Sequence, residues 1–248
     1  MITGKHAVVT GGGRGIGLAI ARALKEKGAH VSIVSRSAPD TGDDFFRAKA
    51  DVSDEASVSR ALDACRAANG PVAILVNDAG IAQGAPLKRT DKAMWDRIIG
   101  TNLTGTYLCT RMVIEEMFAA KWGRIVNVAS LAGLYGAPYI TAYTASKHGI
   151  MGFTRALVPE LEGSGVTANA ICPGYVDTDM MESAVANIVA RTGMDASQAR
   201  EQLAQMNPGG RLATLEEIAN AAVSLIESGE NGREVVLPDP RESTLDHV

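Results

Sequence analysis

Tyr143 and Lys147 are the residues of this sequence whose types and spacing most directly suggest chemistry. They lie four positions apart in Tyr-Thr-Ala-Ser-Lys, so on a helix both side chains share one face. A lysine ammonium placed there favours the ionised form of the phenol, whose ordinary pKa is about 10. A phenol with a lowered pKa is a general acid or base for carbonyl and alcohol chemistry. An ordinary amphipathic helix can carry the same pair, so other motifs must decide.

A glycine-rich turn near the start of the chain is the second motif. The apolar run at residues 5–10 predicts a strand, and residues 16–24 predict a helix that ends near Gly28. Glycines between the two elements let the backbone approach a pyrophosphate, whose charge the amides of the helix N-terminus favour. We therefore expect a dinucleotide site, with a turn that binds no ligand as the alternative. The essential glycines are Gly11, Gly15 and Gly17.

Seven motifs in order carry a family resemblance. They are Thr10-Gly-x-x-x-Gly-x-Gly17, Asp51-Val52, Asn77-Asp-Ala-Gly80, Asn102-Leu-Thr-Gly105, Ser130, Tyr143-x-x-x-Lys147 and Pro173-Gly174. With them the chain resembles the short-chain dehydrogenase/reductase family over about residues 4–238, and 3-oxoacyl-thioester reductases within it. Asp78 departs from the family's usual Asn-Asn-Ala-Gly motif. We expect only a modest effect, because the other three residues of the motif are present.

Length and apolar patterning predict one α/β domain over residues 1–248. The hydrophobic content of 46% supports a substantial core. Apolar runs alternate with helical stretches, as a doubly wound parallel sheet requires. The further strands are expected at residues 31–35, 72–77, 123–129, 166–171 and 234–237. We expect a single Rossmann-like sheet with helices on both faces, a helical substrate lid at 178–208 and a polar C-terminal tail at 241–248. A capping box at Thr214 and Glu217 predicts another helix.

Charge and cysteine content argue against several classes of protein. The net charge is −4 and the charges of both signs are interspersed, which indicates neither a nucleic-acid surface nor a polybasic membrane patch. The 3 cysteines are widely spaced and the 4 histidines scattered, so we expect neither a disulfide framework nor a metal site. Because no apolar stretch reaches about 18 residues, we expect no export signal or membrane span, and a cytoplasmic location.

The end of the second strand bears on the choice of cofactor. About 20 residues beyond the glycine turn, an acid would bind the adenosine ribose of NAD. This chain has Ser35 and Arg36 there instead, and the planar guanidinium of Arg36 suits a phosphate on the ribose oxygen. Arg14 would add a second positive charge. We therefore favour NADP(H) over NAD(H); the alternative is that both arginines are solvated surface residues.

The family resemblance implies a role for each motif residue. Tyr143 is the acid and base, Lys147 lowers its pKa and binds the nicotinamide ribose, and Ser130 orients the substrate carbonyl. Asn102 begins a helix whose kinked backbone holds a proton-relaying water; taken alone, it would be a plain N-cap. The implied cofactor contacts are Gly11, Arg14, Gly15, Ile16, Gly17, Ser35, Arg36, Asp51, Val52, Asn77, Ala79, Gly80, Tyr143, Lys147, Pro173, Gly174, Val176 and Thr178.

The substrate is expected in an apolar pocket between the lid and its facing loops. Its lining is predicted from Leu131, Leu134, Tyr135, Tyr139, Tyr175, Met180 and Met181. Such a pocket suits a small-molecule ketone, and the resemblance favours 3-oxoacyl thioesters. Three functions stay open: an NADPH-dependent ketoreductase, an NAD-dependent alcohol or cyclic dihydrodiol dehydrogenase, and a non-catalytic dinucleotide sensor. The stretch 37–49, short as in dihydrodiol dehydrogenases, keeps the second function open. The resemblance also implies a homo-oligomer, either a tetramer or a dimer.

Overall fold

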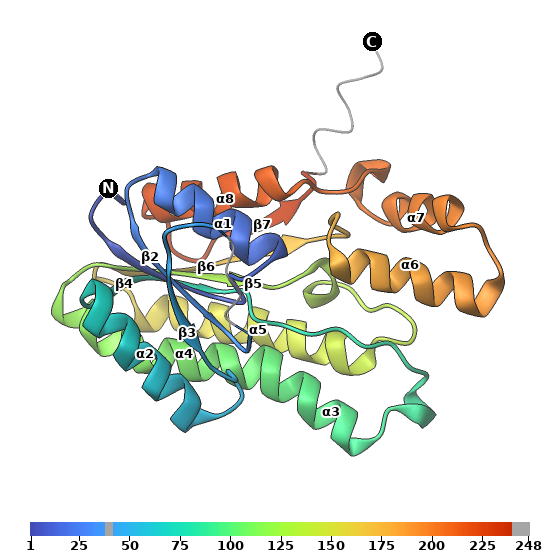
Figure 1. Cartoon of the computed structure of the whole chain (residues 1–248), viewed down its shortest axis with the longest axis horizontal. Helices are drawn as coiled ribbons and strands as arrows, with labels where there is room; N and C mark the ends of the chain where they lie inside the picture. Colours follow the sequence, from blue (N-terminus) through green and yellow to red (C-terminus); the bar gives the residue numbers. More distant parts are fainter. Residues whose placement is uncertain (38–41, 240–248) are drawn as a thin grey trace, which may run out of the picture.

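The core of the protein is a parallel sheet, which runs through the middle of the molecule in the computed structural model (Figure 1). The structure describes residues 1–37 and 42–239, and their seven strands follow the order β3-β2-β1-β4-β5-β6-β7. The strands are β1 (His6–Thr10), β2 (His30–Ser35), β3 (Phe46–Lys49), β4 (Val72–Asn77), β5 (Gly123–Val128), β6 (Val166–Pro173) and β7 (Glu234–Leu237). The strand order reverses between β1 and β4, and in such sheets ligands bind at the carboxyl ends beside this point.

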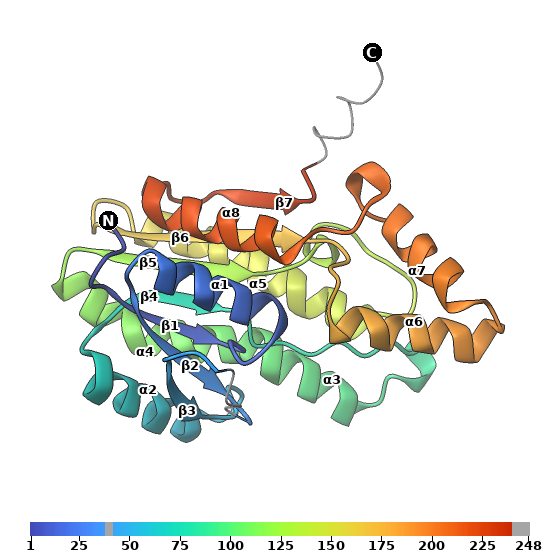
Figure 2. The ribbon, with the colours of Figure 1, turned by 45° about the horizontal axis from the view of Figure 1, so that its top comes forward.

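Helices cover both faces of the sheet. The helices α1 (Gly15–Glu26) and α8 (Leu215–Ser228) pack together on one face. The other face carries α2 (Glu55–Asn69), α4 (Gly105–Ala119) and α5 (Thr141–Glu160) (Figure 2). The strands between them are almost continuously apolar and buried, which is expected where both faces of a parallel sheet are covered. The doubly wound α/β fold predicted from the sequence is confirmed.

The remaining helices lie around the carboxyl ends of the strands. Helix α3 (Lys92–Ile99) continues into α4 through a π-helical turn, Gly100–Thr104. Helices α6 (Asp179–Thr192) and α7 (Ala196–Gln205) extend beyond the ends of β6 and β7 (Figures 1 and 2). They lie within residues 178–208, the segment predicted to be a helical lid and called the lid below. The predicted tail, 241–248, lies outside the described residues.

The predicted strands are present with shifts of one or two residues at their ends, but β3 was not predicted. Its sequence, Phe-Arg-Ala-Lys, is short and half charged, so it shows no apolar run. Its pairing with β2 makes it a strand, and within the described part of the 36–45 stretch no helix precedes it. The capping box is confirmed: the Glu217 N–H donates to Thr214 Oγ1 at 3.1 Å, and the Thr214 N–H donates to Glu217 Oε2 at 2.6 Å.

The cysteines are buried thiols. Cys65, Cys109 and Cys172 are free, and burial raises the pKa of these thiols to about 11, 12 and 11. They are therefore protonated and unreactive at neutral pH. No helix in residues 1–37 or 42–239 combines the length and apolar character needed to cross a membrane.

Candidate active site

Three predicted catalytic side chains meet where β5 ends and α5 begins. Ser130 follows β5; its hydroxyl accepts from the Ala132 N–H at 3.1 Å and lies beside the Tyr143 phenol. Tyr143 and Lys147 lie one turn apart on α5, and the Lys147 ammonium is 5.7 Å from the centre of the Tyr143 ring. Lys147 is buried, and its Nζ donates to the Val128 carbonyl at 2.8 Å. The spacing read from the sequence therefore brings a phenol, a hydroxyl and an ammonium into one group.

The electrostatics of Tyr143 differ from the sequence prediction. Burial raises the pKa of the phenol, and the charge of Asp78 raises it further, while the hydrogen bond from Ser130 opposes them. The prediction that Lys147 lowers this pKa below its ordinary value is therefore wrong for the chain as it stands. Burial acts on the lysine as well and lowers the pKa of Lys147 to about 8. Tyr143 consequently keeps its proton at neutral pH.

Asn102 holds the catalytic helix against the end of β4. It is buried in the π-helical turn, and its Nδ2 donates to the Ile81 carbonyl at 3.0 Å and to Ser146 Oγ at 2.9 Å. Its Oδ1 accepts from the Ile81 N–H at 2.9 Å. The prediction that Asn102 begins a helix, or caps one, is wrong, because α3 and α4 run through this position without a break. Turns of this type occur often at functional sites.

The glycine turn fits a dinucleotide. Gly11 has φ +71°, and a Cβ added there would lie 2.9 Å from the Ala79 amide nitrogen. Gly15 has φ +53° and opens α1, whose N-terminus receives no hydrogen bond from the side chain of its capping residue, Arg14. Backbone N–H groups of this first turn are the donors that bind a pyrophosphate. Thr178, at the base of the lid, places its methyl 3.6 Å from the Cβ position of Gly15.

Asn77 is a predicted cofactor contact whose side chain points into the sheet instead. The strand register sets Thr10, Asn77 and Asn127 at one level of β1, β4 and β5. Asn77 is buried, and its Nδ2 donates to Asn127 Oδ1 at 2.9 Å and to Thr110 Oγ1 at 3.1 Å. The side chain therefore ties the sheet to α4. The sequence motif does not reveal the direction of the Asn77 side chain, because that direction depends on the partners that the neighbouring strands provide.

Other predicted cofactor contacts form the back of the site. Val52 is buried, and a Cβ at Gly105 would stand 2.7 Å from its Cγ2, so it packs on α4. Val176 is buried and bridges to Ala213. Thr10 holds the end of the Asn77-Asp-Ala-Gly80 motif in place, because its Oγ1 accepts from the Asp78 and Ala79 amides, both at 3.1 Å. A Cβ at Gly80 would lie 3.5 Å from Asn102 Oδ1. The side chain of Ile16 packs on the hydrophobic core.

The adenosine end of the site carries the residues predicted to choose the cofactor. Arg36 is exposed just after β2. Asp51 accepts from the Ser53 hydroxyl at 2.6 Å, and this bond, with the more distant charge of Arg36, lowers the pKa of Asp51. Arg14 turns elsewhere: its guanidinium lies 3.2 Å from Asp179 on the lid, and both side chains are more than three-quarters exposed (77% and 78%). The ion pair links the glycine turn to the lid.

The predicted substrate residues divide into two groups. Tyr135, Tyr139 and Met180 are exposed, by 68%, 60% and 48%, at the surface of the facing loop and the lid. Met181 is 2% exposed and packs with Leu203 inside the lid, so it stabilises the lid and does not line the pocket. The remaining members, Leu131, Leu134 and Tyr175, are partly buried.

Asn207 is a residue of the site that the sequence analysis missed. Its buried amide accepts from the Tyr175 N–H at 2.7 Å and donates to the carbonyls of Tyr175 and Arg211, both at 2.8 Å. The Asn207 amide fills the space that a Cβ at position 174 would need, so this position requires glycine. The amide therefore fixes the Pro173–Gly174 exit of β6 and anchors the lid. Its position before Pro-Gly-Gly suggests a turn, but nothing local shows its partners.

The parallel sheet, the uncapped glycine turn and the Ser130, Tyr143 and Lys147 group define a dinucleotide-dependent oxidoreductase. The family model for short chain dehydrogenases matches residues 5–188. The chain belongs to this family, which confirms the resemblance seen in its motifs. It acts on hydroxyl or carbonyl groups with a nicotinamide cofactor. No group of His, Cys, Asp and Glu within the described residues is arranged to hold a metal ion.

Three relatives span almost the whole chain. D-beta-hydroxybutyrate dehydrogenase of Cupriavidus necator is 37% identical over 246 residues, 95% of each protein. The 3-oxoacyl-acyl-carrier-protein reductase of Escherichia coli (strain K12) is 36% identical over 229 residues, 90% of this chain and 89% of that one. The crystal structure of an actinorhodin polyketide ketoreductase variant with NADPH has a TM-score of 0.89 at 31% identity, covering 96% of this chain and 97% of that one.

Proposed function

We propose that this enzyme reduces a hydrophobic ketone of the 3-oxoacyl-thioester type, with NADPH as its cofactor. The observation that carries this proposal is the group formed by Ser130, Tyr143 and Lys147, in which the Lys147 ammonium lies 5.7 Å from the centre of the Tyr143 ring. Reduction of a carbonyl needs a proton donor for the oxygen as hydride reaches the carbon. The phenol of Tyr143, which lies beside Ser130 where β5 ends, is such a donor.

The catalytic steps follow from the positions of the side chains. The hydroxyls of Ser130 and Tyr143 together bind the substrate carbonyl oxygen, where negative charge grows in the transition state. The bound cofactor supplies the hydride. Tyr143 then donates its proton to that oxygen, and the product is the secondary alcohol. Lys147, fixed by Val128 and adjacent to the phenol ring, stabilises the phenolate that results.

The preference for NADPH rests on the end of β2. An acidic residue at position 35 or 36 would repel a phosphate on the adenosine ribose. This chain has Ser35 and Arg36 at these positions, and the exposed guanidinium of Arg36 is suited to bind that phosphate. The actinorhodin ketoreductase variant, 31% identical, was crystallised with NADPH, which also supports this choice. Asp51 would accept from the adenine amine. Gly11, Gly15 and the uncapped N-terminus of α1 would hold the pyrophosphate.

The substrate class rests on the uncharged pocket and on one relative. Apart from Met181, which packs inside the lid, six predicted pocket residues remain and all are uncharged, which suits an acyl thioester better than a free acid. The Escherichia coli relative at 36% identity is a 3-oxoacyl-acyl-carrier-protein reductase. A second candidate, an NAD-dependent alcohol dehydrogenase, is favoured by the 37% identity to D-beta-hydroxybutyrate dehydrogenase.

We also propose a cytoplasmic homo-oligomer that pairs through α4 and α5. The outer face of these helices carries Tyr107, which is 42% exposed and meets Phe153 edge to face with ring centres 6.4 Å apart. Aromatic side chains are enriched at surfaces that another subunit covers, and here Tyr107 is exposed while Phe153 is partly buried. The buried free thiols agree with a reducing compartment.

The proposal is tested by initial rates of NADPH and NADH oxidation with a short 3-oxoacyl thioester. We expect turnover with NADPH and at least about 10-fold less with NADH, which corresponds to about 1.4 kcal/mol in transition-state binding. A preference for NADH would support the dehydrogenase candidate. No turnover with either cofactor would overturn the thioester assignment and direct the search to cyclic ketones.

The Arg36→Asp variant tests the cofactor preference separately. It removes the partner of the ribose phosphate and adds repulsion, so NADPH binding should weaken far more than NADH binding. Fluorescence titration of both cofactors measures the two affinities. Equal losses for the two cofactors would show that Arg36 does not contact the phosphate.

A further inference from the structure

Asp78 places a carboxyl group where β4 ends against the first turn of α1. The carboxylate lies against the first turn of α1, where a Cβ added to Gly17 would stand only 2.6 Å from Asp78 Oδ2. The Asp78 backbone is held by Thr10, whose Oγ1 accepts its N–H at 3.1 Å. The residue remains partly exposed. The carboxyl therefore sits at the positive end of α1, at the turn where the dinucleotide binds.

The groups around Asp78 leave its charge finely balanced. From α5, the Lys147 ammonium attracts the carboxylate, and Tyr143 faces it as a neutral phenol. From β6, the Cys172 thiol lies near Lys147, and burial keeps this thiol protonated. From β1, Thr10 contributes only an uncharged hydroxyl. Desolvation outweighs the ammonium and the Gly17 amide, and raises the pKa of Asp78 to about 7.

Cofactor binding should disturb this balance in one direction. The pyrophosphate carries negative charge and binds to the N-terminal amides of α1, and the Asp78 carboxylate already lies against this turn at Gly17. Two anions then share one positive helix end. The dinucleotide also covers the part of Asp78 that is still exposed. Both effects penalise the carboxylate and favour its protonated form.

We propose that Asp78 couples cofactor binding to proton uptake, because its carboxylate takes a proton from solvent when the dinucleotide pyrophosphate occupies the N-terminus of α1. The inference rests on the proposed function only in that a reduced nicotinamide dinucleotide binds at the glycine turn. Asp78 is a positioning residue in this role, since it acts through the amides and Lys147 and transfers nothing to the substrate. An asparagine, the family's usual residue at this position, cannot take up the proton.

The sign of the pH effect follows from linkage. A group whose pKa rises on binding makes the complex stronger at low pH, so cofactor affinity should fall as pH rises through about 7. Each unit by which binding raises the pKa of Asp78 gives a loss of about 10-fold in affinity across the transition. Asp78→Asn should remove this loss. The effect is independent of the substrate.

Calorimetric titration of the full chain with NADPH, from pH 6 to 8.5, tests the coupling. Near pH 7 the measured heat of binding should differ between two buffers of different ionisation enthalpy, and this difference gives the number of protons taken up. If binding raises the pKa of Asp78 by one unit, the uptake should reach up to about half a proton. Asp78→Asn should show little uptake. The ribose phosphate of NADPH titrates in the same range, so any dependence common to both proteins belongs to the cofactor. NADH, which lacks that phosphate, serves as the second probe.

Asp96→Asn is the matched control, because it removes one exposed carboxylate of α3 that pairs with Lys92, remote from the glycine turn. It should titrate like the unchanged protein. Equal proton uptake by Asp78→Asn and the unchanged protein with NADH would overturn the inference while leaving the proposed function intact. Failure of both dinucleotides to bind would overturn the proposed function itself. If Asp78→Asn does not fold, absence of uptake with NADH in the unchanged protein overturns the inference alone.

Discussion

The catalytic floor and the lid of this enzyme are held in place by opposite means. The catalytic floor, formed by Asn102, Ser130, Tyr143 and Lys147, is fixed by buried hydrogen bonds to the backbone at Ile81 and Val128 and to neighbouring hydroxyls. The two helices of the lid, within residues 178–208, are held mainly by a small apolar cluster and by largely exposed ion pairs, and the buried amide of Asn207 fixes only the base of the lid to the end of β6.

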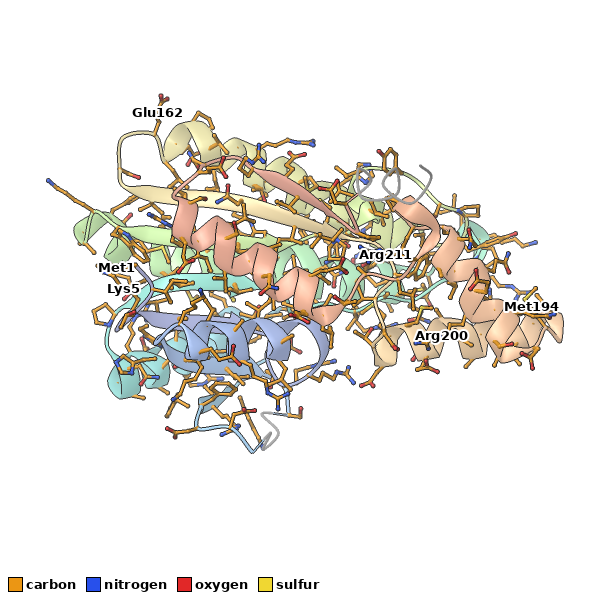
Figure 3. The ribbon with its side chains drawn as sticks, turned by 90° about the horizontal axis from the view of Figure 1, so that it is seen from above. Met1, Lys5, Glu162, Met194, Arg200 and Arg211 are labelled. Carbon is orange, nitrogen blue, oxygen red and sulfur yellow. The ribbon has the colours of Figure 1, made fainter. Side chains whose placement is uncertain are left out.

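The ion pairs of the lid centre on Arg200. This residue on α7 lies 2.5 Å from Asp177 and also pairs with Glu182 on α6 (Figure 3). Met194 marks the outer end of the lid, away from the sheet (Figure 3). Exposed pairs contribute about 0–1 kcal/mol each, whereas leaving a buried polar group without its partner costs about 1–3 kcal/mol. We therefore expect the catalytic floor to be rigid and the lid to move at little cost in free energy.

The largest expected effect is on the catalytic floor itself. Tyr143→Phe removes the proton donor and keeps the ring, so kcat should fall by about 10²- to 10⁴-fold while cofactor affinity changes little. Steady-state rates and cofactor fluorescence measure the two quantities. A variant with ordinary turnover would show that another group donates the proton.

A smaller but clear effect is expected when the support of the floor is removed. Asn102→Ala leaves the Ile81 N–H and carbonyl and the Ser146 hydroxyl without this partner, so the free energy of unfolding should fall by about 2–4 kcal/mol. Urea unfolding measures the loss. A change below about 1 kcal/mol would mean that the floor is no more firmly held than the lid.

The smallest effect on stability is expected in the lid. Arg200→Ala breaks both ion pairs, yet the free energy of unfolding should fall by less than about 1 kcal/mol because the two partner carboxylates are largely solvated. Arg191→Ala, at the end of α6, is the matched control for loss of a lid arginine. The Arg200 variant should raise KM for the thioester more than it lowers kcat, since only the cover is loosened. A loss of stability like that of Asn102→Ala would erase the contrast between the two regions.

Local patterns in the sequence determined most of the fold and the composition of the site. Continuous apolar runs marked β1, β4 and β6 because both faces of a parallel sheet are buried. The Thr214 and Glu217 capping box marked α8, since its two hydrogen bonds span only three residues. The four-residue spacing of Tyr143 and Lys147 was enough to predict that their side chains are neighbours, because the helix period alone sets them on one face of α5.

Only the tertiary structure decided how those residues act. Burial raised the pKa of Tyr143, where the sequence indicated that Lys147 would lower it. Asn77 turned to the sheet and Asn102 became a buried brace, because acceptors far along the chain bind their Nδ2 groups. Met181 packed inside the lid for a similar reason. Local spacing sets which side chains are neighbours on one element; desolvation and long-range partners, which set charge and direction, arise only when the elements pack together.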